Sequence, residues 1–168
     1  HIVTTQSFDI FLATEGYGVE RYDTLGNLLD TNLNFSKREK CSGFVSYKDT
    51  LYFCDVNNRE IIVINSKGDS LFTIKHSWTI NDNLYSISCD INGNIYVYGV
   101  FNENYGIQVF SKTGVFLREF SVDGNTKMIS ISGDQLFLFY SGLNSSLIRC
   151  VDLFGKLQFK FSIQSARI

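Results

Sequence analysis

The sequence predicts an all-β protein, and three features of its composition support that prediction. The 168 residues include no proline and only two alanines, Ala13 and Ala166, against fifteen phenylalanines and nine tyrosines. Helices are usually rich in alanine, leucine, glutamate and lysine, whereas strands favour β-branched and aromatic side chains. The hydrophobic share of 44% is also too high for a disordered chain. We therefore expect a folded domain built from strands.

An internal repeat organises these strands. Four segments share one layout, a strand, a polar turn that ends in glycine, and a second strand. The turn glycines Gly26, Gly68, Gly114 and Gly155 follow one another at intervals of 42, 46 and 41 residues. Glycine adopts a positive φ without a steric penalty, so this regular position indicates a hairpin turn in each repeat.

A second pair of strands precedes each hairpin. In chain order these predicted pairs are Ile2–Thr5 with Ile10–Ala13, Phe44–Tyr47 with Leu51–Cys54, Leu84–Asp90 with Asn94–Tyr98, and Met128–Ser132 with Leu136–Tyr140. The second strand of each pair is apolar on both faces, whereas a strand solvated on one side alternates. Each repeat therefore predicts a four-stranded antiparallel meander that is covered on both faces.

Such meanders, repeated at about 40–50 residues, are typical of β-propeller blades. We predict one propeller unit over residues 1–168, with blades at approximately 1–35, 43–77, 84–122 and 127–164. Four blades make either a small ring or part of a larger ring that missing blades or oligomerisation would complete. The chain starts at His1 without a methionine or a charged-then-apolar leader, which indicates that a signal peptide is absent or already removed and favours part of a larger ring while leaving the small ring open.

The third repeat resembles an NHL-type repeat. The resemblance is carried by Ile107–Phe120 and by the preceding Asp90–Val97, and the second repeat matches at Asp55 and Asn58 but has Glu60 where the family usually has arginine. NHL repeats form six-bladed propellers, notably at the C-terminus of tripartite-motif ubiquitin ligases. The resemblance implies a segment that selects the ligase substrate or binds single-stranded RNA, with any ligase chemistry outside these residues.

Charge and cysteine content narrow the functional classes. Fifteen basic and seventeen acidic residues give a net charge of −2, so the chain has no overall positive field for nucleic acid. No apolar run approaches the roughly 20 residues of a membrane helix, so no membrane association is expected. The four cysteines form no C-x-x-C pair, which favours reduced thiols in a cytoplasmic protein over a zinc site. Two N-x-S/T sequons, at Asn34 and Asn144, leave secretion open.

Catalytic motifs are scarce. The only histidines are His1 and His76, no G-x-S-x-G elbow occurs, and His76 is expected to be a solvated loop residue. We therefore predict no enzymatic activity, no catalytic residue and no cofactor. Acidic and amide side chains at the turns within the strand pairs would suit calcium in a propeller hydrolase or lyase, although turn formation explains them more simply: Asp9, Asp90, Asn92 and Asp134.

A binding face is the favoured functional hypothesis. In a propeller, the loops between the second and third strands and between successive blades open on one face, and such loops commonly carry recognition. Aromatic and arginine side chains, which often anchor interfaces, occur there with a basic cluster: Tyr17, Arg59, Trp78, Phe101, Tyr105, Lys37, Arg38 and Lys40. We expect a non-catalytic module that binds a protein partner, although Trp78 and Tyr105 would alternatively pack as loop plugs.

Single-stranded RNA is the alternative partner. Lys37, Arg38 and Lys40 beside aromatic rings would neutralise and stack a short strand. The same loops also contain Glu39 and Glu103, which reduce the net positive charge. Protein binding therefore ranks first and RNA second.

Overall fold

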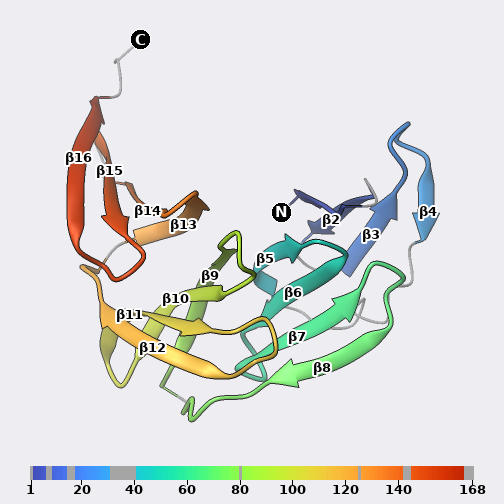
Figure 1. The fold of residues 1–168 in the computed structure, drawn as a ribbon, viewed down its shortest axis with the longest axis horizontal. Helices are drawn as coiled ribbons and strands as arrows, with labels where there is room; N and C mark the ends of the chain where they lie inside the picture. The colour runs from blue at the N-terminus through green and yellow to red at the C-terminus, as the bar shows by residue number, and fades with distance from the viewer. Residues whose placement is uncertain are drawn as a thin grey trace. The chain divides into compact units, whose positions relative to one another are not determined.

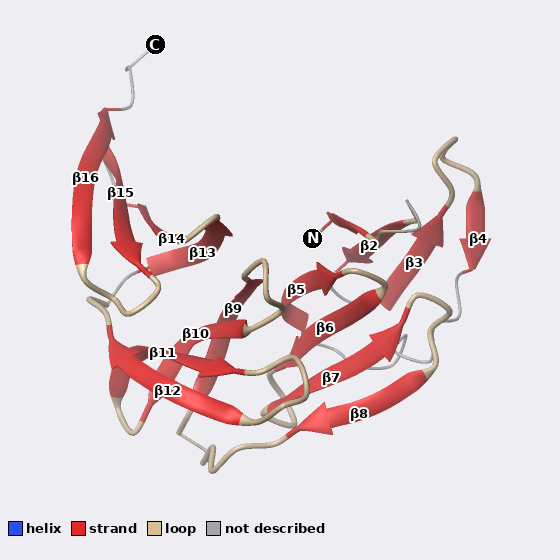
Figure 2. Cartoon of the chain, viewed as in Figure 1, coloured by secondary structure: helices blue, strands red, loops and turns tan. Residues whose placement is uncertain are grey.

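The structure, a computed structural model, describes residues 2–6, 9–14, 18–30, 41–79, 81–124, 126–141 and 145–164. Every regular element among these residues is a β-strand (Figure 2), which confirms the predicted all-β class. None of the described residues belongs to a helix long and apolar enough to span a bilayer. The chain divides into two compact units, residues 1–84 and 85–168, and each is described by itself.

The strands form four antiparallel four-stranded sheets, and in each sheet neighbours in space are neighbours in sequence (Figure 1). The first sheet contains β1 (Ile2–Thr4), β2 (Ile10–Thr14), β3 (Gly18–Tyr22) and β4 (Leu28–Asp30). The second contains β5 (Cys41–Tyr47), β6 (Thr50–Asp55), β7 (Glu60–Asn65) and β8 (Ser70–Ile74). The third contains β9 (Asn83–Cys89), β10 (Ile95–Phe101), β11 (Asn104–Phe110) and β12 (Phe116–Ser121). The fourth contains β13 (Thr126–Ser132), β14 (Gln135–Ser141), β15 (Ser145–Asp152) and β16 (Leu157–Gln164).

These meanders are the four predicted β-propeller blades, and their last hairpins share one local design. The turn glycines have φ values of 82° at Gly26, 89° at Gly68, 87° at Gly114 and 87° at Gly155. A polar side chain at the preceding strand end accepts hydrogen bonds from two turn amides; Asp152 Oδ1, for example, accepts from Phe154 N and Lys156 N, each at 2.9 Å. The predicted positive φ is therefore confirmed, and the side chain satisfies amides that the sheet leaves unpaired.

The core of the first unit lies between its two sheets. Phe11 and Val19 of the first blade pack with Phe44, Phe53 and other apolar side chains of the second. The rings of Phe44 and Phe53 stack at 4.2 Å. All of Leu51–Cys54 is at most 3% exposed, so the predicted burial of both faces of this strand is confirmed.

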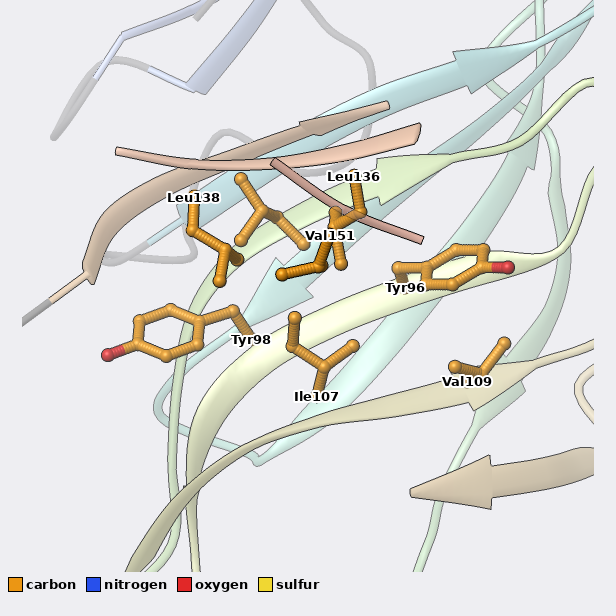
Figure 3. Packing of buried hydrophobic residues seen from close by; sticks show 8 residues of the cluster. Tyr96, Tyr98, Ile107, Val109, Leu136, Leu138 and Val151 are labelled. Atoms are coloured by element: carbon orange, nitrogen blue, oxygen red, sulfur yellow. The ribbon is translucent and has the colours of Figure 1, made fainter. Parts of the chain in front are cut away.

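The core of the second unit lies between the third and fourth blades. Figure 3 shows Tyr96, Tyr98 and Ile107 of the third blade facing Leu136 and other aliphatic side chains of the fourth. Each fully buried side chain of this size contributes roughly 1.5–3 kcal/mol. Hydrogen bonds add to the seam, because Ile129 N donates to Ser86 Oγ and Ile131 N to Ser88 Oγ, both at 3.2 Å.

The β15–β16 turn also packs against the third blade. Arg118 of β12 lies over the ring of Phe154 at 4.6 Å and donates from Nη2 to Leu153 O and to Tyr96 Oη, each at 3.0 Å. Tyr96 Oη in turn lies 3.3 Å from Asp90 Oδ2. This arginine therefore connects the two blades of the second unit.

The other face of the fourth blade is apolar. Phe139 pairs with Ile148, and Ile148 pairs with Phe161, so these three side chains share one face. They occupy the repeat positions at which the third blade has Tyr98, Ile107 and Phe120, but Phe161 is 45% exposed. The repeat thus places a blade-packing surface on this side of the last sheet.

Candidate functional site

The predicted binding residues divide between described and undescribed parts of the chain. Tyr17, Lys37, Arg38 and Lys40 lie outside the described residues. In the first unit, Arg59 occupies the β6–β7 turn with a φ of 51°, and half-buried Trp78 follows β8 with its ring edge-on to His76 at 6.0 Å. In the second unit, Phe101 and Tyr105 flank the β10–β11 turn.

Phe101 and Tyr105 differ in exposure because the β10–β11 turn is short. Asn102 and Glu103 both have positive φ, 48° and 66°, which defines the two-residue hairpin turn that matches strand twist. β10 therefore continues to Phe101, which pairs with Asn104 and is 2% exposed. Tyr105 is 38% exposed and is the predicted residue that the second unit presents on its surface.

Tyr105 belongs to a hollow of about 320 Å³ that the sequence did not predict. Its lining comes from the start of β9, the middle of β10, the start of β11 and the start of β13, and we call it the tyrosine hollow: Tyr85, Tyr98, Tyr105, Thr126 and Lys127. Thr126 and Lys127 follow the β12–β13 loop, one of the loop classes expected on the binding face. Neither residue is aromatic, so the aromatic pattern that predicts the binding face does not include them.

Packing fixes the rings of the hollow. The Tyr98 and Tyr105 rings are nearly parallel at 6.2 Å, and the Tyr85 ring lies 5.8 Å from that of Tyr98. Gly124 lies so close to Tyr105 that a Cβ there would stand 2.8 Å from Tyr105 Cε2. Val122 N also donates to Tyr105 O at 3.2 Å. Tyr105 is therefore held against the β12–β13 loop rather than left to rotate in solvent.

Burial keeps two phenol groups of the hollow, those of Tyr98 and Tyr85, protonated at neutral pH. Burial is the main cause that raises the pKa of Tyr98 to about 12, and burial followed by the nearby Tyr105 raises the pKa of Tyr85. Among the described residues neither Tyr98 Oη nor Tyr140 Oη has a hydrogen bond of normal geometry, although Thr126 is near enough to oppose the rise of both pKa values. The hollow thus contains hydroxyl groups with unused hydrogen-bonding capacity.

The charges beside the hollow are largely paired. Asp123 forms an ion pair with Arg149, whose guanidinium lies 5.0 Å above the Tyr140 ring. Glu119 Oε2 accepts from Gln108 Nε2 at 2.7 Å. Within the described part of the chain, Lys127 has no ion pair. The positive charge of Lys127 is therefore available to a ligand.

Two of the acidic residues considered for calcium, Asp90 and Asp9, have other roles. Asp90 caps its turn by accepting from Asn92 N and Asn94 N at 2.9 Å, and Asp9 forms an ion pair with Arg21 at 2.6 Å. Among the described residues no three histidine, cysteine or acidic side chains are grouped to hold a metal. All four cysteines are free thiols.

The fold and the loop-end hollow define the class as a β-propeller, and similar solved structures agree. A streptogramin B lyase is 15% identical with a TM-score of 0.70, and the match covers 95% of this chain and 53% of the lyase chain. Virginiamycin B lyase from Staphylococcus aureus is 16% identical with a TM-score of 0.69, covering 98% and 55%. A chain of a nidogen/laminin complex is 15% identical with a TM-score of 0.68, covering 94% and 62%.

These similarities establish the fold alone. The chain spans about half the length of the two lyases. No protein-family model matches the chain, and no curated protein matches it. The NHL-type resemblance of the third repeat therefore stays a prediction.

Proposed function

We propose that this propeller is a non-catalytic interaction module that binds a protein partner at the tyrosine hollow. The observation that supports this most directly is the pair Tyr85 and Tyr105, which are 40% and 38% exposed at the edge of a hollow whose rings are held in place. Tyrosine provides a large, rigid contact surface with a polar tip and is enriched in interfaces. Because these rings are already positioned, binding orders few side chains and loses little entropy.

We also propose a partner class, a cellular location and a way to complete the ring for this module. The nidogen/laminin structure is a propeller in a protein complex, which supports a protein partner for this fold. The NHL-type third repeat supports a role in choosing the substrate of a tripartite-motif-like ubiquitin ligase. The free thiols support a reducing, cytoplasmic location. The apolar face around Phe161 supports completion of the ring by further blades or by oligomerisation.

Affinity capture tests the proposal. The wild-type chain, Tyr105→Ala and Ile91→Ala are compared for the proteins that they retain from an extract of the source cells. Ile91 is 82% exposed in the β9–β10 turn, at the opposite end of the same blade from the β10–β11 turn, so it is a matched surface control. We expect Tyr105→Ala to lose a protein that the other two chains retain, with the fold intact by circular dichroism.

Two results would argue against protein binding at this site. Equal capture by all three chains would remove the tyrosine hollow as the interface. Retention of RNA that weakens steeply with salt would favour the RNA alternative.

A further inference from the structure

We propose that the tyrosine hollow recognises a carboxylate group of the partner, with Lys127 as the counter-ion and the tyrosine hydroxyls as hydrogen-bond donors. This inference rests on the proposed function, because the carboxylate is presented by the bound protein.

The charge of the hollow determines the sign of the ligand. Among the described residues, Lys127 is the one charged side chain of the lining, and none of these lining residues carries a carboxylate. Of the acidic groups on the adjoining strands and loops, Asp123 and Glu119 are engaged by Arg149 and Gln108, and Glu103 of the β10–β11 turn is not part of the lining. A cationic ligand such as a methylated lysine would meet the tyrosine rings but also the ammonium of Lys127. An anionic ligand meets no carboxylate of the lining.

The hydroxyl groups determine the type of anion. Tyr98 is fully buried, and Figure 3 shows its hydroxyl pointing away from Ile107 and Leu138. That hydroxyl makes no hydrogen bond of normal geometry among the described residues, although Thr126, 5% exposed, is close enough to oppose the rise of its pKa. Protonated hydroxyls donate to an oxygen acceptor and cannot neutralise a cation. Tyr85, Tyr98 and Tyr105 each bring a hydroxyl to the lining of the hollow, whereas the Thr126 hydroxyl donates to Asp123 O at 3.5 Å.

Charge number and volume favour a carboxylate over a phosphate. A phosphate carries about −1.5 to −2 charges and is usually bound by several arginines. In the part of the chain that the structure describes, the lining includes one lysine and no arginine, which matches a single negative charge. Its volume of about 320 Å³ is at the lower end of ligand pockets, enough for one or two side chains of a peptide. The carboxylate would belong to an acidic side chain or to a chain terminus.

Small probes are titrated into the full chain, and their binding is monitored by NMR through the amide resonances of residues 85–164. The probes are N-acetyl-glutamate N-methylamide for a side-chain carboxylate, N-acetyl-glycylglycine for a C-terminal carboxylate, and N-acetyl-glutamine N-methylamide as the neutral equivalent. We expect one or both carboxylates to shift the resonances of Tyr105 and Lys127, and the neutral probe to leave them unchanged. The carboxylate that binds more tightly identifies the source.

Lys127→Gln and Lys160→Gln form a matched pair for this test. Both lysines are exposed in the fourth blade, but Lys160 lies on β16 and does not line the hollow. We expect Lys127→Gln to weaken carboxylate binding by roughly threefold to tenfold, the range of a partly exposed charge contact. Lys160→Gln should leave the affinity unchanged.

The outcomes separate this inference from the proposed function. Equal binding of the acidic and neutral probes, or no shift with any probe, overturns carboxylate recognition. Tighter binding of a trimethyllysine peptide overturns it too. If Tyr105→Ala abolishes partner capture and Lys127→Gln does not, protein binding stands and carboxylate recognition fails. If both variants capture the partner while the probes still bind through Lys127, the hollow binds carboxylates and the proposed interface fails.

Discussion

Replacement of Gly155 by alanine should destabilise the second unit more than the same replacement at an otherwise comparable turn. Gly155 has a φ of 87°, and a Cβ there would lie 2.5 Å from Phe120 Cδ2. Gly133, in the β13–β14 turn, has a φ of 62°, and a Cβ there would meet nothing within 4 Å. The pair therefore separates backbone strain from steric overlap in one unit.

The magnitudes follow from those two contributions. A left-handed backbone conformation costs an L-residue about 1–2 kcal/mol, so Gly155→Ala and Gly133→Ala should both lose that much free energy of unfolding. Overpacking against Phe120 costs Gly155→Ala about 1–3 kcal/mol more. At a urea slope of about 2 kcal/mol/M, the extra loss moves the midpoint down by a further 0.5–1.5 M or so. Gly26→Ala, where space is also open, should resemble Gly133→Ala.

Urea unfolding followed by circular dichroism provides the measurement. The single tryptophan, Trp78, lies in the first unit, so its fluorescence would miss a change confined to the second. In a Phe120→Leu background the additional cost of Gly155→Ala should shrink, since the smaller side chain relieves the overlap. Equal midpoints for Gly155→Ala and Gly133→Ala would refute the packing of the β15–β16 turn against β12.

Two further predictions concern the seam between the third and fourth blades. Burial raises the pKa of Tyr98 from 10.0 to about 12, so the native state holds that proton more tightly and stability should fall as the pH rises from 10 to 12. Tyr98→Phe should show a shallower alkaline decline in urea midpoint, and parallel curves would contradict this assignment. Ser86→Ala leaves the buried Ile129 N–H without its acceptor and should cost about 1–3 kcal/mol. The exposed Ser121→Ala should stay within about 0.5 kcal/mol, and a similar loss for both would show that the Ser86 bond is unimportant.

The repeat allowed most of the fold to be predicted because its signals are local. A glycine with positive φ at the end of a polar turn, such as Gly68 or Gly114, is constrained by its own backbone. A strand with apolar side chains on both faces, such as Leu51–Cys54, indicates its burial without knowledge of its neighbours. The blades could therefore be located before any contact was known.

The tyrosine hollow could not be predicted in the same way because it depends on register and on packing between blades. The Asn102-Glu103 turn lacks the glycine that usually marks a two-residue hairpin, so Phe101 was expected in a loop although it closes β10. Tyr98 was expected to be an ordinary core residue. Thr126 reaches it only because the fourth blade packs on the third. The spacing of residues in the sequence does not indicate the contact between Thr126 and Tyr98.

The consecutive strand order of every sheet has a consequence for how the chain folds. In the third sheet β9 pairs with β10, β10 with β11 and β11 with β12, so each pairing closes a short loop. Short loops lose little entropy on closure, which allows each blade to form before a neighbour is present. Burial of Tyr96 and Ile107 then requires the next blade, so stability accumulates as blades are added. During synthesis, the strands of the third meander pair first, and the later packing of β13–β16 then buries its apolar face.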